Sequence, residues 1–184
     1  MTLRTDLAAL LADAGIIDVD VDEAVADEHV RSAAYQRVVS VAAAAQSRDG
    51  DRGIVATILR DPHEMAARTA VVALVDKIAM NATDAAEFRR WAEEILAETD
   101  RFETEGNREF VRRRVRDWLF YLSIKDGRVP DPAELADVTD WMQRLLAEES
   151  TSLPVLDLLA GSGSTRKIRN IAKNRAAGRE PRDH

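Results

Sequence analysis

The sequence predicts an all-α fold of stacked antiparallel helical hairpins, and three observations lead to this prediction. Apolar residues recur at helical spacing along nearly the whole chain, whereas the alternation that marks β-strands is almost absent. Glycine and proline fall between the periodic segments, where they end helices. Hydrophobic residues make up 46% of the 184 residues but aromatic ones only 5%, so the core must consist mainly of Ala, Leu, Val and Ile.

The periodic segments predict nine helices joined by short turns. They cover residues 2–14, 22–46, 52–60, 62–80, 83–99, 105–125, 131–149, 152–160 and 165–177. From this order we expect either a short regular array of helical hairpins or an irregular helical bundle.

Turn and capping residues mark the boundaries of these helices. Gly15 can end the first helix in a left-handed conformation, which glycine adopts without strain. The residues that can cap the N-termini of later helices are Asp61, Thr83, Asp131 and either Ser164 or Thr165. No linker is long enough to separate two domains. We therefore expect a single helical domain over residues 1–177 and a short flexible tail over residues 178–184.

The composition excludes several classes of protein. The chain has no cysteine, which rules out a disulfide framework, a thiolate zinc site and a cysteine nucleophile. No long apolar run follows the N-terminus, so no signal peptide is expected. Charges interrupt every apolar stretch before the roughly 20 residues that a membrane span needs. We expect a cytoplasmic protein that has no membrane partner.

No group of residues predicts catalysis, a metal or a cofactor. The three histidines are far apart in sequence, and no His-Glu-x-x-His pattern is present. Asp18, Asp20 and Asp22 are spaced like the start of a calcium loop, but the glycine and the glutamate that such a loop requires are missing. These aspartates are more simply interpreted as the acidic start of a helix. An enzyme is therefore not the favoured prediction.

A short pattern recurs four times along the chain. It consists of an apolar residue, an arginine, two further residues and a small or apolar residue. The four arginines are Arg31, Arg68, Arg112 and Arg169, separated by 37, 44 and 57 residues. The two best-formed copies are residues 27–34 and residues 59–74, and the second begins with an Asp-Pro turn.

This pattern resembles HEAT repeats, the helical-hairpin units of α-solenoids, in which an Asp-Pro turn often precedes an apolar-Arg pair. The resemblance covers most of the chain, although the 57-residue spacing exceeds the usual period of about 40–47 residues and implies an inserted helix. It implies a short HEAT-like solenoid whose concave face is the default binding site. Such units often carry a ladder of arginines between repeats, which implies that Arg68 pairs with an acidic residue of a neighbouring helix.

Charge is distributed unevenly along the chain. From Thr165 to the end, seven basic residues stand against two acidic ones and give +5, so the net charge of −7 leaves −12 for residues 1–164. The candidate binding residues on the predicted helix 165–177 are Arg166, Lys167, Arg169 and Lys173. The Gly-Ser turn before them can offer free N–H groups to an anion. The alternative is that this helix only caps the end of the fold with a polar face.

Two further features have structural interpretations that we favour. The arginines of the predicted helix 105–125 could bind anions, but Glu109, Arg113 and Asp117 are spaced to pair along a solvated surface. Core packing, rather than anchoring of a partner, is expected for the three tryptophans, which are Trp91, Trp118 and Trp141.

Taken together, these features predict non-catalytic recognition of another macromolecule. Another protein is the expected partner, because the acidic body suits a basic surface and the basic C-terminal helix suits an acidic one. The alternative is nucleic-acid binding centred on that helix, which would weaken steeply as salt rises.

Overall fold

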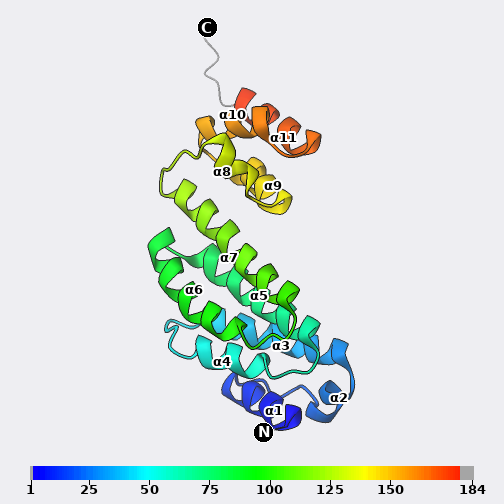
Figure 1. Cartoon of the computed structure of the whole chain (residues 1–184). Coiled ribbons are helices and arrows are strands. Elements are labelled where there is room, and N and C mark those ends of the chain that lie inside the picture. Colours follow the sequence, from blue (N-terminus) through cyan, green and yellow to red (C-terminus); the bar gives the residue numbers. More distant parts are fainter. Residues whose placement is uncertain (1, 179–184) are drawn as a thin grey trace. The chain divides into compact units, whose positions relative to one another are not determined.

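The computed structural model describes residues 2–178, and every regular element in that range is an α-helix (Figure 1), which confirms the all-α prediction. No helix within this range is long and apolar enough to cross a membrane. The first helices are α1 (Leu3–Asp13), α2 (Val21–Ala26), α3 (Glu28–Ala44), α4 (Asp51–Ile58), α5 (Glu64–Asn81) and α6 (Ala85–Thr99). The later ones are α7 (Glu105–Lys125), α8 (Pro132–Ala136), α9 (Asp140–Glu149), α10 (Leu153–Ser162) and α11 (Arg166–Ala177).

Two of the predicted helices are each divided in two by a residue that caps the second part. The predicted helix 22–46 breaks at Asp27, whose extended backbone separates α2 from α3 and whose side chain accepts from the first N–H groups of α3. The predicted helix 131–149 breaks before Thr139, which caps α9 in the same way. Asp and Thr side chains bond readily to nearby backbone, so they compete with helix continuation even where the apolar periodicity persists.

Several of the predicted end signals are confirmed. Gly15 has φ +67°, and the N–H groups of Gly15 and Ile16 donate to the carbonyls of Ala12 and Leu11, the paired bonds of a Schellman cap. Asp131 forms a reciprocal capping box with Glu134 at the start of α8. The last helix, α11, is capped by Thr165 rather than by Ser164.

The predicted caps Asp61 and Thr83 are wrong. Helix α5 begins at Glu64 rather than at residue 62, because the Asp61 carboxylate is turned into the protein interior. Helix α6 is capped by Asp84, and Thr83 instead donates its backbone N–H to Glu87 at 2.8 Å. At the start of α6 the next residue, Asp84, accepts from the Glu87 N–H and so caps the helix, whereas His63 at the start of α5 makes no capping bond with its side chain.

The chain divides into two compact units, residues 1–115 and residues 116–184. We call them unit 1 and unit 2, and the boundary falls within α7. The single domain over residues 1–177 stays a prediction. Of the predicted tail, only Gly178 lies within the described residues.

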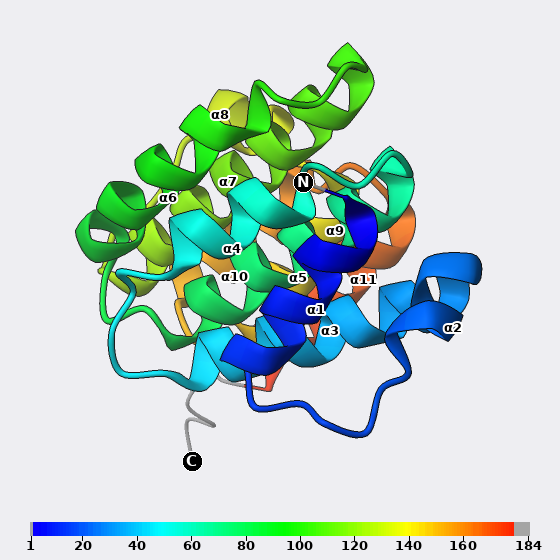
Figure 2. The same ribbon diagram turned by 90° about the horizontal axis from the view of Figure 1, so that it is seen from below.

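In unit 1, helices that are next but one in sequence are neighbours in space. Helix α3 packs along α5, α4 packs along α6, and α1 contacts α3. Helix α1 also packs against α4, which is three helices further along the chain. Figure 2 shows α1 in front of α3 and α4, with α2 at the side of α3. The core between them is aliphatic, as the composition predicts, and includes Val38, Val39, Val55, Ile58, Val71, Leu74 and Val75.

In unit 2, the hairpin of α10 and α11 is the closest helix pair, and α9 packs against both helices. Its core includes Leu122, Leu135, Met142, Leu146, Leu156, Leu159 and Ile168. Trp118 is buried there, with its ring 5.7 Å from that of Trp141 in an edge-to-face arrangement. Trp91 of unit 1 is also buried, but Trp141 remains 40% exposed, so the prediction of core packing is confirmed for two tryptophans and wrong for the third.

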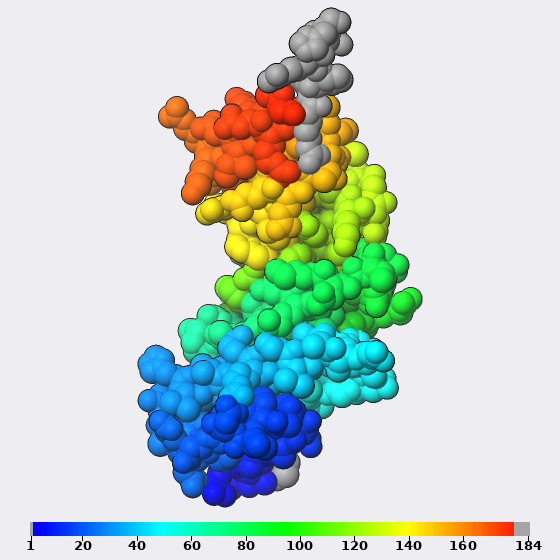
Figure 3. All heavy atoms as spheres, turned by 180° about the vertical axis from the view of Figure 1, so that it is seen from behind, coloured from blue at the N-terminus to red at the C-terminus, as the bar shows by residue number. Residues whose placement is uncertain are grey.

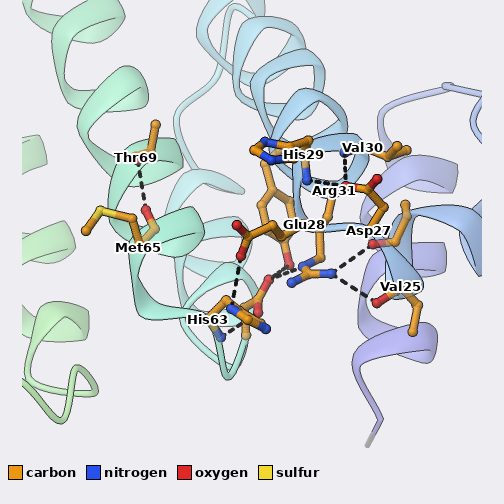
Figure 4. Close-up of polar contacts among 12 residues, drawn as sticks. Val25, Asp27, Glu28, His29, Val30, Arg31, His63, Met65 and Thr69 are labelled. Carbon is orange, nitrogen blue, oxygen red and sulfur yellow. Dashed lines mark hydrogen bonds and ion pairs between the residues drawn. The ribbon is translucent and has the colours of Figure 1, made fainter.

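A buried guanidinium joins the start of α3 to the loop between α4 and α5 (Figure 4). The Nε of Arg31 donates to Asp61 Oδ2 at 2.7 Å, and its Nη1 donates to the carbonyls of Ala24 and Val25 at 2.9 and 3.1 Å. The Tyr35 hydroxyl donates to the same Asp61 oxygen at 2.9 Å. Burial, with the adjacent Asp61 charge, raises the pKa of Tyr35 above its ordinary value.

Candidate binding surface on helix α11

Helix α11 turns one side to the core of unit 2 and the other to solvent. It begins after Thr165, whose hydroxyl accepts from the Ile168 N–H at 3.2 Å. Ile168, Ala172 and Ala176 are buried at four-residue spacing, which places them on one side of the helix. The polar residues on the opposite side are thereby held at the surface.

The turn before α11 is closed by hydrogen bonds rather than open to an anion. The Ser164 N–H donates to Oε1 of the buried Gln143 at 2.9 Å, and the Gly163 N–H donates to the Leu159 carbonyl at 2.9 Å. The Gln143 amide also donates to two carbonyls in and just after α8, both at 3.0 Å. The expectation of free N–H groups in this turn is therefore wrong for both residues, because the end of α10 supplies one acceptor and the side chain of Gln143, 21 residues away, supplies the other.

Arg169, one of the four predicted binding residues, is engaged within the fold. It is half-buried, and its Nη1 donates to the Gly163 carbonyl at 2.6 Å. Arg175, which was not singled out from the sequence, donates in the same manner to the Ala147 carbonyl at 3.3 Å. Both arginines satisfy carbonyls at the C-terminal ends of preceding helices, where the helix dipole favours a cation.

The other three predicted residues, Arg166, Lys167 and Lys173, are exposed. Their side chains form no ion pair or hydrogen bond with any residue in the described range 2–178. Asn170 and Asn174, which the sequence analysis missed, are exposed on the same side of the helix. Helix α11, coloured orange to red, forms part of the surface of unit 2 in Figure 3. These five side chains form what we call the α11 face.

Elsewhere in the described chain, arginines are commonly held by carboxylates. Arg60 donates two hydrogen bonds to Asp6, at 3.0 and 2.8 Å. Glu98 is clamped between Arg52 and Arg101 at 2.6 and 2.7 Å, and these bonds lower the pKa of the Glu98 carboxyl. Arg166, Lys167 and Lys173 are three cations on one face of a single helix that no described carboxylate contacts.

Carboxylates also neutralise part of the predicted anion-binding side of α7. Arg108 pairs with Glu105 at 2.7 Å, and Arg112 pairs with Asp100 and Glu105 at 2.9 and 3.2 Å. Asp117, expected on a solvated surface, is instead 4% exposed and accepts from the capping residue of α9. Its role in unit 2 is therefore structural.

Arg68 does not have the acidic partner that the resemblance to HEAT repeats implied. Its Nη1 donates to Asn107 Oδ1 at 3.1 Å, its Nη2 lies 2.8 Å from the Met65 sulfur, and its guanidinium carbon lies 4.5 Å from the centre of the Phe110 ring. Asn107 then donates to Glu64 at 2.7 Å. Arg68 therefore contacts the neighbouring helix α7, but its partner there is the Asn107 amide. This amide lies between the Arg68 guanidinium and the carboxylate of Glu64, which belongs to the same helix as Arg68.

The three aspartates near the start of α2 each have a separate role. Asp18 pairs with Arg37 and Asp22 pairs with Arg4, both at 2.6 Å, while Asp20 caps α2. Within residues 2–178, no group of three or more His, Asp and Glu side chains is placed to hold a metal ion.

A hollow of about 200 Å³ in unit 1 lies where the C-terminal ends of α3 and α5 meet the start of α6. Its lining includes Ala45, Arg48, Ile78, Ala82, Phe88 and Trp91. Behind it, Asp51 accepts from the Trp91 indole at 2.9 Å and lies 3.4 Å from Arg48. Burial raises the pKa of the Asp51 carboxyl. The two polar groups satisfy this carboxyl within the fold.

A second hollow, of about 280 Å³, lies in unit 2 and includes Tyr121, Lys125, Glu149 and Ser152 in its lining. The Tyr121 hydroxyl donates to Glu149 at 2.8 Å. Burial, reinforced by this bond, raises the pKa of Tyr121 to about 12. A tyrosine with so high a pKa stays protonated at neutral pH, so it acts as a hydrogen-bond donor rather than as a base.

Comparison with known proteins yields no match: the chain matches no protein-family model, no curated protein and no solved structure. The contacts and charges of the chain's own residues are therefore what indicates its function.

Proposed function

We propose that the chain is a non-catalytic binding protein whose α11 face binds an acidic surface of another protein. The observation that carries this proposal is that Arg166, Lys167 and Lys173 are exposed on one helix without a carboxylate partner among the described residues. Carboxylates of a partner would form the charge-assisted hydrogen bonds that these side chains lack. The neighbouring asparagines supply further donors and acceptors at the same surface.

Two properties favour a protein over a nucleic acid as the partner. Helix α11 has no aromatic side chain on which a base could stack. Proteins that bind nucleic acids neutralise several phosphates, whereas the α11 face offers only three cations. Nucleic-acid binding through α11 is the alternative that the experiment below separates.

For unit 1, we propose a short HEAT-like array as the scaffold. Two features support it: α3 lies along α5 while α4 lies along α6, as corresponding helices of successive hairpins do. In addition, Arg31, from the first copy of the recurring pattern, binds Asp61 at the start of the second copy. Arg68, from the second copy, reaches α7 through Asn107.

The test compares the intact chain with a triple variant, Arg166→Glu, Lys167→Glu and Lys173→Glu. Fluorescently labelled poly-glutamate serves as the acidic-protein probe and labelled duplex DNA as the second probe, each over a salt series. We expect salt-sensitive binding of poly-glutamate by the intact chain and a loss of roughly tenfold or more in the variant, because the change reverses the sign of the surface that meets the probe.

The matched control reverses three exposed cations outside α11, Arg89, Arg90 and Lys125, which likewise have no ion pair with a described residue. It changes the net charge by the same amount and should retain binding. Equal loss in both variants, or no binding by the intact chain, would contradict the proposal. Tighter binding of DNA than of poly-glutamate, lost only in the α11 variant, would establish the nucleic-acid alternative instead.

A further inference from the structure

Two exposed apolar side chains meet around one arginine in unit 1. Met65 on α5 is 59% exposed, and Phe110 on α7 is 43% exposed. Arg68 lies between them, with Nη2 2.8 Å from the Met65 sulfur and the guanidinium carbon 4.5 Å from the centre of the Phe110 ring. The Met65 side chain points away from the buried Arg31 cluster (Figure 4). We call these three residues, Met65, Arg68 and Phe110, the Met65–Phe110 surface.

This surface is held in place by its neighbours. Asn107 accepts from Arg68 at 3.1 Å and donates to Glu64 at 2.7 Å, so a hydrogen-bonded amide also holds the arginine. The guanidinium carbon of Arg114 lies 5.9 Å from the centre of the Phe110 ring. Side chains that are already ordered lose little conformational freedom when a partner binds them.

The chemistry of the surface specifies what would bind it. Arginine, methionine and aromatic side chains are enriched at protein interfaces, where a few of them carry most of the binding energy. The direct contacts of Arg68 are all neutral: an amide oxygen, a thioether and an aromatic ring. Arg113 is exposed and lies three positions from Phe110 on the same helix, which makes it a surface neighbour. The surface thus combines apolar contact area with positive charge. At Arg68, no carboxylate contacts the guanidinium directly.

We infer that the Met65–Phe110 surface docks a segment of a partner protein in which an apolar side chain is flanked by carboxylates. The apolar side chain covers Met65 and the exposed part of the Phe110 ring, while the carboxylates face Arg68 and Arg113. This surface belongs to unit 1 and is made of residues other than those of the α11 face, so the inference does not depend on the proposed function.

The probe is a labelled synthetic peptide in which one phenylalanine is flanked on both sides by aspartates, with glycine and serine elsewhere. Its binding to the full chain is measured by fluorescence anisotropy. Two companion peptides replace the phenylalanine with alanine or the aspartates with asparagines. We expect saturable micromolar binding of the parent peptide and weaker binding of both companions.

The variant Met65→Ser should weaken binding of the parent peptide roughly tenfold, as the loss of a central contact does. The matched control is Met80→Ser, because Met80 lies on the same helix and is 61% exposed, and it should bind as the unaltered chain does. Arg68→Gln should remove the preference for aspartate over asparagine in the peptide. Circular dichroism of each variant checks that its helix content is unchanged.

Three outcomes would overturn the inference: no saturable binding by the intact chain, equal binding of all three peptides, or equal effects of Met65→Ser and Met80→Ser. The triple α11 variant provides the separation from the proposed function. It should bind the peptide as the unaltered chain does. Loss of peptide binding in this variant would show that the peptide binds to the α11 face, and would refute a docking site at the Met65–Phe110 surface.

Discussion

The substitution Asp61→Asn should destabilise unit 1 strongly. Asp61 is buried and accepts from Arg31 at 2.7 Å, from the Tyr35 hydroxyl at 2.9 Å and from the His63 N–H at 2.8 Å. Its two oxygens serve three donors, so an amide in its place turns one acceptor into a donor and forces donors to face each other. The substitution also leaves the Arg31 charge buried without a counterion.

The magnitude follows from the burial of this pair, whose side chains are 2% and 0% exposed. Removing one member of a buried ion pair costs about 3–5 kcal/mol. In a chain of this length each kcal/mol lowers the melting temperature by about 2–4 °C, so the expected fall is roughly 6–20 °C. The same substitution at Asp22 should have a far smaller effect on stability, because its partner Arg4 and the carboxylate itself are 63% and 72% exposed and water screens their interaction.

Urea and thermal unfolding followed by far-ultraviolet circular dichroism would measure both variants against the unaltered chain. The decisive quantity is the difference between the free energies of unfolding of Asp61→Asn and Asp22→Asn. If the two losses were equal and small, the buried pair would not be holding α3 to the loop before α5, and the reasoning about Arg31 would be refuted.

Three further predictions concern single positions. Gly163→Ala should lower the free energy of unfolding by about 1–3 kcal/mol, because a Cβ there would lie 2.6 Å from a carbonyl oxygen. Gly161→Ala meets open space and should stabilise α10. Unfolding curves that rank the two variants the other way would contradict this prediction. The raised pKa of Tyr121 means that its stabilising contribution is complete below about pH 10 and is lost as pH rises through about 12; tyrosinate absorbance that developed fully near pH 10 in the folded chain would disprove it. A hydrogen bond from the Thr104 side chain lowers the pKa of Glu64. The contribution of Glu64 to stability is therefore present above about pH 4.5 and is lost as pH falls through the lowered pKa. An NMR titration that gave an ordinary glutamate pKa would exclude that bond.

Features that depend on local sequence were predictable in this chain. The left-handed cap at Gly15 and the capping box at Asp131 need only residues within one helical turn, so their chemistry can be recognised directly. The capping roles of Asp27 and Thr139 were missed, although each is of a residue type that caps helices. The apolar periodicity continues through both positions, and it outweighed the capping signal in the prediction.

Features that depend on distant residues were not predictable. Asp61 was predicted to cap its own helix and Arg68 to pair with an acidic residue, but Asp61 binds an arginine of α3 and Arg68 binds an amide of α7. The charge and type of a partner that is 30 or 39 residues away are set by how helices pack, not by the neighbouring sequence. The Met65–Phe110 surface likewise combines residues of two helices, so neither helix alone predicts it.

The sequence by itself determined that the chain is helical and that its last helix is basic, because periodicity and charge are properties of residue order. Tertiary structure decided which of those basic residues remain free at the surface. Arg169 faces a carbonyl that the tight turn at Gly163 brings within 2.6 Å, and it becomes part of the fold. Arg166, Lys167 and Lys173 point away from the packed side of the same helix and form no ion pair or hydrogen bond with a described residue, so their charge is left for a partner.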